Sequence, residues 1–363
     1  MFLLLFGFYL LGNLYVFLRL WQTVMLWPVW AKCVFVLFFW GCASSFVVSM
    51  LLRNSDVVPG IMRSLFSIGS VWLAVVLYLT LFLLITDVVR LFNNSFNNGV
   101  YYAILLCFIV LCCGYYHYVH PHRKVINIVI NKSNQQFEDK VLKVVAVSDV
   151  HLGYGTTRKM LHRYVEMINA EQPDLILIGG DLIDSSVVPL YEENMQEELS
   201  RLNAKYGVYM VPGNHEYITG IRHSLHFLEQ TPIQVLRDSV VTLPMGIQLV
   251  GRDDRWRRSR KSLQELMEKV NPGLPVLLLD HQPMQLEETE AAGVDLQFSG
   301  HTHRGQLWPF SWVTDYLFQQ SHGYRKWGGS HIYVSSGLSL WGPPFRIGTD
   351  SEMVVFNIEL KSN

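Results

Sequence analysis

Cysteine is absent from the last two thirds of this 363-residue chain, and charged residues are scarce in its first third. Residues 125–363 contain no cysteine, so they form neither a disulfide nor a thiolate metal site and need no oxidising compartment. Residues 1–124 carry seven Lys or Arg and two Asp or Glu, which is nine of the 59 charged residues of the chain. This change in composition predicts two domains, 1–124 and 125–363.

A surplus of charge of either sign is also lacking, because the formal net charge is -1 at pH 7. A surface that binds nucleic acid needs clustered cations that displace counterions from the polyanion. A near-neutral chain offers no such surface over its whole extent. We therefore expect no nucleic-acid partner, and the sequence leaves the oligomeric state open.

Four stretches of the first domain are almost free of charge, and each is near the ~20 residues that span the hydrocarbon core of a bilayer. A cleaved signal peptide would carry a basic segment before its apolar core, and a soluble helical bundle would show a polar face. Neither feature is present. We therefore predict a multi-pass protein of the plasma or inner membrane with four transmembrane helices, at 1–18, 29–52, 65–86 and 99–119.

Four crossings would place both ends of this membrane region on the same side as the second domain. The connections on that side carry four cations and those on the opposite side carry three. Because cytoplasmic loops are enriched in Lys and Arg, this small excess favours a cytoplasmic second domain. The four are Arg53, Arg63, Arg123 and Lys124, and the three are Arg19, Lys32 and Arg90.

Short apolar runs, each followed by polar residues, recur in the second domain and alternate with segments of helical periodicity. Continuous apolar runs are typical of strands buried on both faces of a sheet. The pattern therefore predicts an α/β domain. The expected strands are 125–130, 142–147, 175–178, 208–211, 247–250, 276–279, 296–298, 332–335 and 353–358, and the expected helices are 158–171, 189–202 and 260–270.

Polar clusters follow the carboxyl ends of five of these strands, the edge at which ligands gather in α/β sheets. The Asp-x-His and His-x-His spacings let two side chains of one turn converge on one point, and a preceding glycine permits a close turn. Unrelated turn residues would not recur in this way after five strands. The clusters are Asp149-Val150-His151, Gly180-Asp181-Leu182-Ile183-Asp184, Gly213-Asn214-His215-Glu216, Asp280-His281-Gln282-Pro283 and Gly300-His301-Thr302-His303.

The donors in these clusters are carboxylates, an amide and imidazoles, without any thiolate. Such a mixture favours borderline-hard divalent ions such as manganese, iron or zinc, whereas calcium would require more oxygen ligands. The sequence therefore predicts a metal centre that is assembled from the five clusters.

The order and content of the five clusters resemble the calcineurin-like metallophosphoesterase superfamily, from about Leu142 to Ile358. The resemblance implies a four-layer α/β/β/α sandwich behind the four membrane helices. It also implies two divalent metal ions that share a hydroxide, which attacks phosphorus in line. One ion would be held by Asp149, His151, Asp181 and His303, and the other by Asp181, Asn214, His281 and His301.

Within the same resemblance, His215 would protonate the leaving oxygen or stabilise the transition state, and Asp184 would orient it. The sequence Gly300 to Pro309, with the later Gly342 to Gly348 segment, is similar to a narrower, membrane-attached group. That group includes transmembrane proteins with a metallophosphoesterase domain, and its bacterial members are similar to UDP-2,3-diacylglucosamine hydrolases and lipid-linked phosphodiesterases.

Two arginines of these segments are candidate substrate-binding residues, Arg304 and Arg346. Arg304 stands where many relatives have glycine, so its guanidinium would either face a substrate phosphate or form an outward salt bridge. The stretch Trp308 to Phe345 is dense in aromatic residues, which suggests a lipid-facing lip or ordinary core cover. A cationic run around Trp256, residues 252–261, would engage anionic headgroups or be a solvated loop.

Membrane anchoring favours the bilayer as a partner and a lipid-linked phosphodiester or pyrophosphate as the substrate. Two alternatives stay open at this point. In the first alternative, the chain is a phosphodiesterase of broad specificity on soluble substrates, and the membrane region is only an anchor. In the second, it is a non-catalytic membrane sensor whose metal site is occupied.

Overall fold

The computed structural model describes residues 2–52, 58–132 and 140–362. The chain divides into two compact units, each described here by itself. The first contains Met1–His117 together with Gly342–Ile347, and the second contains Tyr118–Trp341 together with Gly348–Asn363. The domain boundary predicted after residue 124 stays a prediction, and Arg53 lies outside the described residues.

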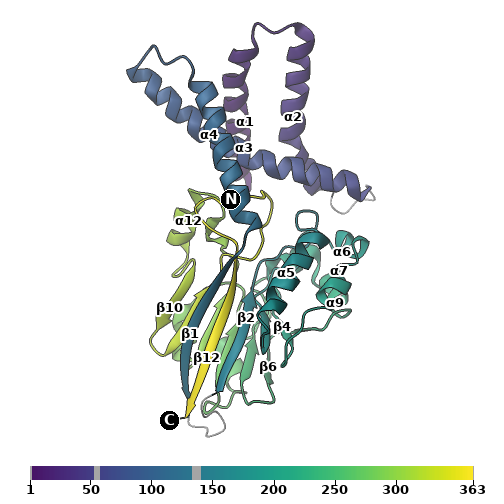
Figure 1. Cartoon of the computed structure of the whole chain (residues 1–363), viewed down its shortest axis with the longest axis vertical. Coiled ribbons are helices and arrows are strands. Elements are labelled where there is room, and N and C mark those ends of the chain that lie inside the picture. Colours follow the sequence, from purple (N-terminus) through teal and green to yellow (C-terminus); the bar gives the residue numbers. More distant parts are fainter. Residues whose placement is uncertain (1, 53–57, 133–139, 363) are drawn as a thin grey trace. The chain divides into compact units, whose positions relative to one another are not determined.

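The first unit is built from four helices: α1 (Phe2–Val24), α2 (Val29–Leu52), α3 (Pro59–Phe92) and α4 (Gly99–Val119) (Figure 1). Among the described residues, three of these helices are long and apolar enough to cross a membrane, namely α2, α3 and α4. The stretches predicted at 29–52 and 99–119 match α2 and α4. The stretch predicted at 65–86 lies inside α3, whose 34 residues would extend about 50 Å, more than a bilayer core requires.

Polar contacts between the apolar helices join α1 to α3. The Trp72 indole N–H donates to the side chain of Asn13 at 2.9 Å, and the Tyr15 hydroxyl donates to Asp87 at 2.6 Å. Asp87 also pairs with Arg19 at 2.6 Å. Ionisable groups in apolar helices are stable only when they are paired, so Asp87 indicates a fixed packing of α1 on α3.

The second unit contains two six-stranded sheets. The first sheet has the order β1-β12-β2-β3-β4-β5 and the second has the order β10-β11-β9-β8-β7-β6. In the first sheet the strands are β1 (His122–Lys132), β2 (Lys140–Val147), β3 (Leu175–Ile178), β4 (Val208–Met210), β5 (Ile233–Val235) and β12 (Glu352–Ser362). In the second they are β6 (Ser239–Thr242), β7 (Gln248–Gly251), β8 (Val276–Leu279), β9 (Leu296–Ser299), β10 (Gly323–Trp327) and β11 (Ser330–Val334).

Parallel pairing in the middle of both sheets creates the edge that the polar clusters need. Strands β2 to β5 are parallel neighbours in the first sheet, and β7, β8, β9 and β11 are parallel neighbours in the second. Antiparallel pairs occur at β12 with β2, β10 with β11 and β6 with β7. The carboxyl ends of consecutive parallel strands therefore lie at one edge of each sheet.

The helix predicted at 158–171 is confirmed by α5 (Arg158–Ala170), whereas the other two helices predicted in the second unit are shorter than expected. The helix expected at 189–202 is divided into α6 (Val188–Glu192) and α7 (Met195–Leu199), because Asn194 adopts a left-handed conformation with φ of 50°. The helix expected at 260–270 is only α10 (Leu263–Met267), which begins at a Ser262 cap. The others are α5 (Arg158–Ala170), α8 (Asn214–Thr219), α9 (Ile221–Leu228), α11 (Leu286–Ala291), α12 (Phe310–Leu317) and the 3-10 turn η2 (His303–Gly305).

Alternate residues of the first sheet enter two different hydrophobic cores. Val145 and Val147 of β2 pack with α5, α6, α7 and α9, the helices beside β2 and β4 in Figure 1. Val144 and Ala146 of β2 pack instead with residues of the second sheet such as Phe298. This alternation explains why β2 reads as a continuous apolar run: both of its faces are buried.

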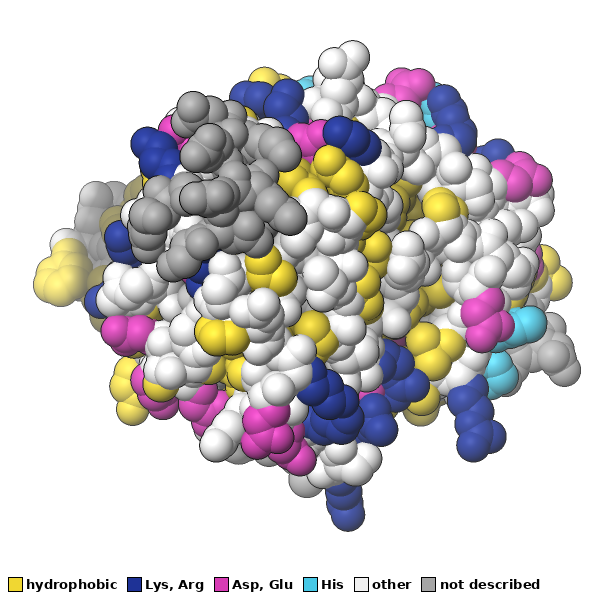
Figure 2. All heavy atoms as spheres, turned by 90° about the horizontal axis from the view of Figure 1, so that it is seen from below, with side chains coloured by type: hydrophobic (Ala, Val, Ile, Leu, Met, Phe, Trp, Pro, Cys, Tyr) yellow, Lys and Arg dark blue, Asp and Glu magenta, His cyan; other side chains and the backbone are white. Residues whose placement is uncertain are grey.

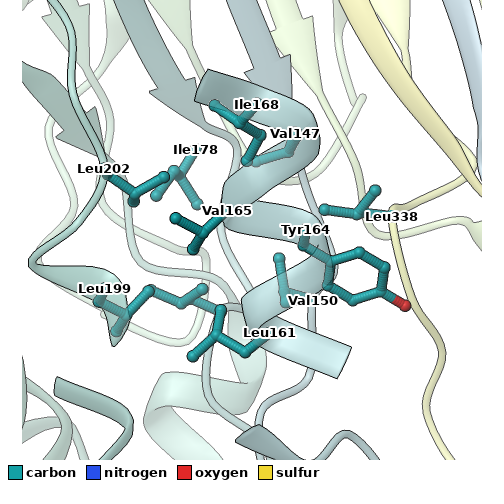
Figure 3. Close-up of a pocket in the computed structure, with 11 residues that line it drawn as sticks. Val147, Val150, Leu161, Tyr164, Val165, Ile168, Ile178, Leu199, Leu202 and Leu338 are labelled. Atoms are coloured by element: carbon teal, nitrogen blue, oxygen red, sulfur yellow. The ribbon is translucent and has the colours of Figure 1, made fainter. Parts of the chain in front are cut away.

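The cavity in Figure 3 lies in the helix-side core, between α5 and the first sheet. Its volume is about 20 Å³, which is about the space of a single water molecule. Its lining is aliphatic except for Tyr164. It offers no convergent polar groups and is a packing defect of the core rather than a ligand site.

Charge is mixed on the face shown in Figure 2, where acidic and basic side chains are interspersed.

A buried carboxylate links the two sheets of the second unit. Glu352 of β12 accepts hydrogen bonds from the Tyr333 hydroxyl of β11 at 3.1 Å and from the Ser336 backbone N–H at 2.9 Å. Burial would raise the pKa of Glu352, but the His322 side chain and these donors outweigh burial and lower it.

Replacing this carboxylate, Glu352→Gln, should lower the free energy of unfolding at pH 7 by about 2 kcal/mol, since an amide leaves buried donors poorly paired. Because the folded pKa of Glu352 lies below its unfolded value, its contribution is present above the unfolded pKa and is lost as the pH falls through the folded pKa. Thermal unfolding of the full chain in detergent at several pH values should show wild type and variant converging in acid. A difference independent of pH would contradict this role.

Candidate metal centre

The five polar clusters lie in turns that directly follow β2, β3, β4, β8 and β9. Three of these strands are neighbours in the first sheet and two are neighbours in the second. Seven predicted ligands therefore come from five separate turns, and the contacts below show that the turns meet. The seven are Asp149, His151, Asp181, Asn214, His281, His301 and His303.

One group of donors consists of Asp149, His151 and His303, whose ligand atoms all lie within 4.8 Å of one another. The Nε2 atoms of the two histidines are 3.1 Å apart. The Oδ1 atom of Asp149 is 3.4 Å from Nε2 of His303 and 3.9 Å from Nε2 of His151. Two imidazole nitrogens and a carboxylate oxygen thus point to one small volume.

A second group consists of Asp181, His281 and His301, whose ligand atoms satisfy the same 4.8 Å limit. Nε2 of His281 is 3.2 Å from Oδ2 of Asp181. The side-chain oxygen of Asn214 is 3.3 Å from Nε2 of His281 and 2.8 Å from Nδ1 of His301. Asp181 lies between the two groups, because its Oδ2 is also 4.0 Å from Nε2 of His151.

These contacts fit a bound cation. Nδ1 of His281 faces the carbonyl oxygen of Gly179 at 2.7 Å and therefore donates to it. A neutral ring then turns the Nε2 lone pair toward the oxygens of Asp181 and Asn214. Electron-rich atoms so close together need a positive charge among them, which a proton or a metal ion supplies.

The pKa values of the histidines agree with this picture. Burial lowers the pKa of His151 to about 3 and that of His301 to about 4, so both rings are neutral near pH 7 and able to bind a metal. Burial also opposes the charged form of His281, but the carboxylates of Asp181 and Asp149 outweigh it and raise its pKa well above the usual value. The surroundings of His281 thus favour positive charge at this ring.

Backbone strain accompanies the ligands. Asp149, His151, Asp181, His301 and His303 have φ values of 55°, 48°, 51°, 72° and 47°. This left-handed conformation is uncommon for residues other than glycine, and it is several-fold enriched in Asp, Asn and His. Such strain persists where the surrounding structure enforces it, and it is concentrated at functional sites.

Two glycines of the clusters are required by close approach. A Cβ atom on Gly213 would lie 2.2 Å from Oδ1 of Asp181, and one on Gly300 would lie 1.9 Å from Oγ of Ser148 and 2.2 Å from Oδ2 of Asp149. Any side chain at either position would displace a candidate ligand. The close turns inferred from sequence therefore have a direct steric basis.

Glu216 positions the same turns, a role that the sequence did not reveal. Its buried carboxylate accepts backbone N–H groups of Asp181 at 3.0 Å, Ile183 at 2.9 Å and Gly213 at 2.7 Å. Burial, followed by the charge of Asp181, raises the pKa of Glu216 to about 7. The spacing of Gly213 and Glu216 in the capping box at the start of α8 was the one available signal.

His215 lies beside both groups. Its Nδ1 is 2.9 Å from Oδ1 of Asp184, and its backbone N–H donates to Oδ1 of Asp181 at 2.8 Å. Its ring is packed edge-on against the ring of His151, with centroids 4.6 Å apart. Burial alone would lower the pKa of His215, but the carboxylates of Asp181 and Asp184 outweigh it and raise the pKa to about 9. A protonated imidazole held by a carboxylate is a suitable proton donor.

His215 also forms a donor group with His151 and Asp181. Geometry alone therefore allows it as a ligand, whereas the resemblance keeps it apart for proton transfer. Trp341, one of the aromatic residues in the stretch Trp308 to Phe345, packs near the His215 ring, with centroids 6.0 Å apart.

The structure does not join the two predicted substrate-binding arginines to these donors. Arg304 occupies the η2 turn with φ of 48°, its backbone N–H donates to Oγ1 of Thr302 at 3.2 Å, and no ion pair of its side chain occurs among the described residues. Arg346 belongs to the other compact unit, where its backbone N–H donates to the carbonyl of Gly114 at 2.9 Å. Both roles stay predictions.

Three of the six cations in the run at 252–261 form ion pairs within the protein. Arg252 and Arg260 both contact Oδ2 of Asp280, and Arg257 pairs with Asp253 at 3.0 Å. These three guanidinium groups are therefore committed to the protein. The reading of the whole run as a headgroup-binding surface finds no support in these contacts.

Comparison with known proteins places the donors within one sequence family. The family profile described as "Calcineurin-like phosphoesterase" matches residues 142–305, which include all seven candidate ligands. A Helicobacter pylori protein named "Uncharacterized metallophosphoesterase" is 35% identical over 273 residues, an alignment that covers 73% of this chain and 71% of that protein. A Bos taurus protein named "Transmembrane protein with metallophosphoesterase domain" is 32% identical over 232 residues, covering 58% of this chain and 52% of that protein.

Among solved structures, a putative 5'-nucleotidase from Staphylococcus aureus is 13% identical. The superposition has a TM-score of 0.38 and covers 59% of this chain and 54% of that chain.

Replacing Asp181 should remove bound metal, because its carboxylate lies between the two donor groups. We expect Asp181→Ala to weaken divalent-ion binding by about tenfold or more, measured by elemental analysis and calorimetry of the full chain. Asp184→Asn is the matched control, since Asp184 contacts His215 and belongs to neither of the two groups. Full metal content in Asp181→Ala, or equal loss in both variants, would contradict the assignment.

Proposed function

The chain belongs to the calcineurin-like metallophosphoesterase family, and from this premise we propose that it is a membrane-anchored phosphoesterase that uses two divalent metal ions. Family membership implies metal-dependent hydrolysis of a phosphoester. The finer proposal is that the substrate is a phosphodiester or a pyrophosphate, and that it is carried on a lipid.

The observation that supports two ions is the pair of donor groups on either side of Asp181. Asp149, His151 and His303 would hold one ion, Asn214, His281 and His301 would hold the other, and Asp181 would serve both. Bound divalent ions supply a water of lowered pKa and neutralise the charge that develops on the phosphoryl oxygens. Manganese, iron and zinc all suit this set of donors.

The chain's own residues then orient the ligands and move a proton. Glu216 and the close glycines fix the turns from which Asp181 and Asn214 project. Asp184 accepts from Nδ1 of His215 and leaves Nε2 of that ring to donate a proton to the leaving oxygen. Despite burial, the carboxylates of Asp181 and Asp184 raise the pKa of His215 to about 9, so the ring holds the proton that it would donate.

Three apolar helices long enough to span a membrane support the choice of a lipid-linked substrate, because they tether the enzyme where such substrates are abundant. We propose that α1 is the fourth span and that the catalytic unit is cytoplasmic. We also propose that the sheets and helices of the second unit form the four-layer α/β/β/α order of the family. Arg304 is proposed to contact the substrate phosphate.

Replacing His215 should separate chemistry from metal binding. We expect His215→Ala to lower kcat by about 10²- to 10⁴-fold while divalent-metal content stays near that of wild type. The control is His226→Ala, since His226 is an exposed histidine of α9 that belongs to none of the five clusters. Loss of metal together with activity would instead make His215 a ligand.

The substrate class is tested with the full chain in vesicles. Wild type and Asp181→Ala are assayed on a phospholipid diester, a glycolipid diphosphate and the soluble bis-p-nitrophenyl phosphate. The proposal expects hydrolysis of a lipid substrate that the variant does not catalyse. Equal rates on lipid and soluble substrates would favour the anchored broad-specificity enzyme, and metal binding without hydrolysis of any of them would favour the sensor.

A further inference from the structure

Helix α12, which follows the metal-ligand loop, exposes its apolar residues to solvent. None of its eight residues is buried. Trp312, Val313, Tyr316 and Leu317 are 65%, 50%, 88% and 63% exposed. Phe310 and the preceding Trp308 are also more than 40% exposed, and the Trp308 and Trp312 rings contact each other edge-on at 5.3 Å. We call these six side chains the α12 patch.

The opposite side of the helix carries two small polar residues, Ser311 and Thr314, and the aromatic Phe318 follows directly after the helix. All three are only partly exposed and lie at helical spacings of three and four. The Thr314 hydroxyl donates a hydrogen bond to the carbonyl oxygen of Ser311 at 2.9 Å. A helix on a water-facing surface has the reverse arrangement, with large apolar residues turned toward the protein. The α12 patch is therefore oriented for contact with something other than water.

Helix α12 is fastened to the loop that carries two candidate metal ligands. A Cβ atom on Gly305 would lie 2.4 Å from the backbone of Phe310 and Ser311, so the η2 turn and α12 are in direct contact. The Thr302 hydroxyl donates to the carbonyl of Ser321 at 2.6 Å. The Phe318 ring meets the His301 ring edge-on, with centroids 6.0 Å apart. Whatever the patch contacts is thus held close to His301.

The chain segment that contains the patch carries more cations than anions. Between His303 and Trp327 the chain has three cations, Arg304, Arg325 and Lys326, and one anion, Asp315. Asp315 accepts a hydrogen bond from the Ser321 hydroxyl. Arg325 and Lys326 are exposed on β10. Exposed Trp, Tyr and Leu in a segment that also carries cations are a composition that favours the interface of an anionic bilayer.

We propose that the α12 patch is a docking surface for the surface of an anionic lipid bilayer. The occupant is argued from the exposed aromatic side chains of the patch, from the cations of its chain segment and from the apolar helices of the same chain, which tether the second unit to a bilayer. Docking brings the metal centre to the level of the lipid headgroups. This consequence rests on the proposed phosphoesterase function and narrows its substrate to phosphoesters at the bilayer surface.

The docking can be tested independently of catalysis by measuring how deeply the α12 patch enters the membrane. The full chain, with its five native cysteines replaced by alanine, carries Tyr316→Cys labelled with an environment-sensitive fluorophore, in phosphatidylglycerol-containing vesicles. We expect a blue shift and strong quenching by lipids with nitroxide groups near the headgroup. Glu229→Cys, at an exposed position just after α9, labelled in the same way, should show neither. Equal behaviour of the two labels, or protection at position 316 by a second copy of the chain, would overturn the proposal.

Activity gives a second readout in the native cysteine background. We expect the double variant Trp312→Glu/Tyr316→Glu to lose about tenfold or more of kcat/KM on a phosphoester in anionic vesicles and to keep its rate on bis-p-nitrophenyl phosphate. The control Asn203→Glu/Gln230→Glu adds the same charge at exposed polar sites and should change neither rate. Equal loss on both substrates in the α12 variant would overturn docking. Wild type inactive on both would refute the phosphoesterase function, while the fluorophore measurement would still decide the docking.

Discussion

The second unit holds several carboxylates and imidazole rings close together in a buried space, and much of its structure serves this arrangement. Carboxylates of Asp149 and Asp181, and the rings of His151, His281, His301 and His303, converge at the edge where two sheets end. Lone pairs and negative charges in such proximity are unfavourable unless a cation is placed among them. Left-handed turns at five of the ligands, the close approach of Gly213 and Gly300, and the three N–H groups bound by Glu216 all serve this convergence.

The candidate metal centre could be predicted from the sequence because its donor residues occur in short clusters in a fixed order. Asp149 and His301 follow apolar runs that are buried on both faces, and the carboxyl ends of parallel strands share an edge. The family resemblance is confirmed by the comparisons. The structure confirms the mixed α/β fold and shows two sheets in it. The roles of the individual residues are not tested by these comparisons and stay predictions.

Other features depend on tertiary contacts that could not be predicted from a single sequence. Asn194 divides the predicted helix at 189–202 by a left-handed turn, although the apolar periodicity continues across it. Glu216 acts through backbone N–H groups of distant turns, which leave no pattern in the chain. The first apolar stretch forms α1, but it is not among the three described helices that meet the length and hydropathy of a membrane span. The aromatic stretch after Trp308 was ambiguous until the exposure of Tyr316 and Trp312 separated surface from core.

The segment from His301 to Phe318 contains both candidate metal ligands and the helix of the proposed membrane-docking patch. Two of its residues are candidate ligands, and its helix turns its aromatic side chains outward. The most direct test of the two-metal account is the anomalous scattering of manganese bound to the full chain. The account predicts two peaks, one among Asp149, His151 and His303 and one among Asn214, His281 and His301, with Asp181 adjacent to both. A single peak, or a peak held by His215, would contradict it.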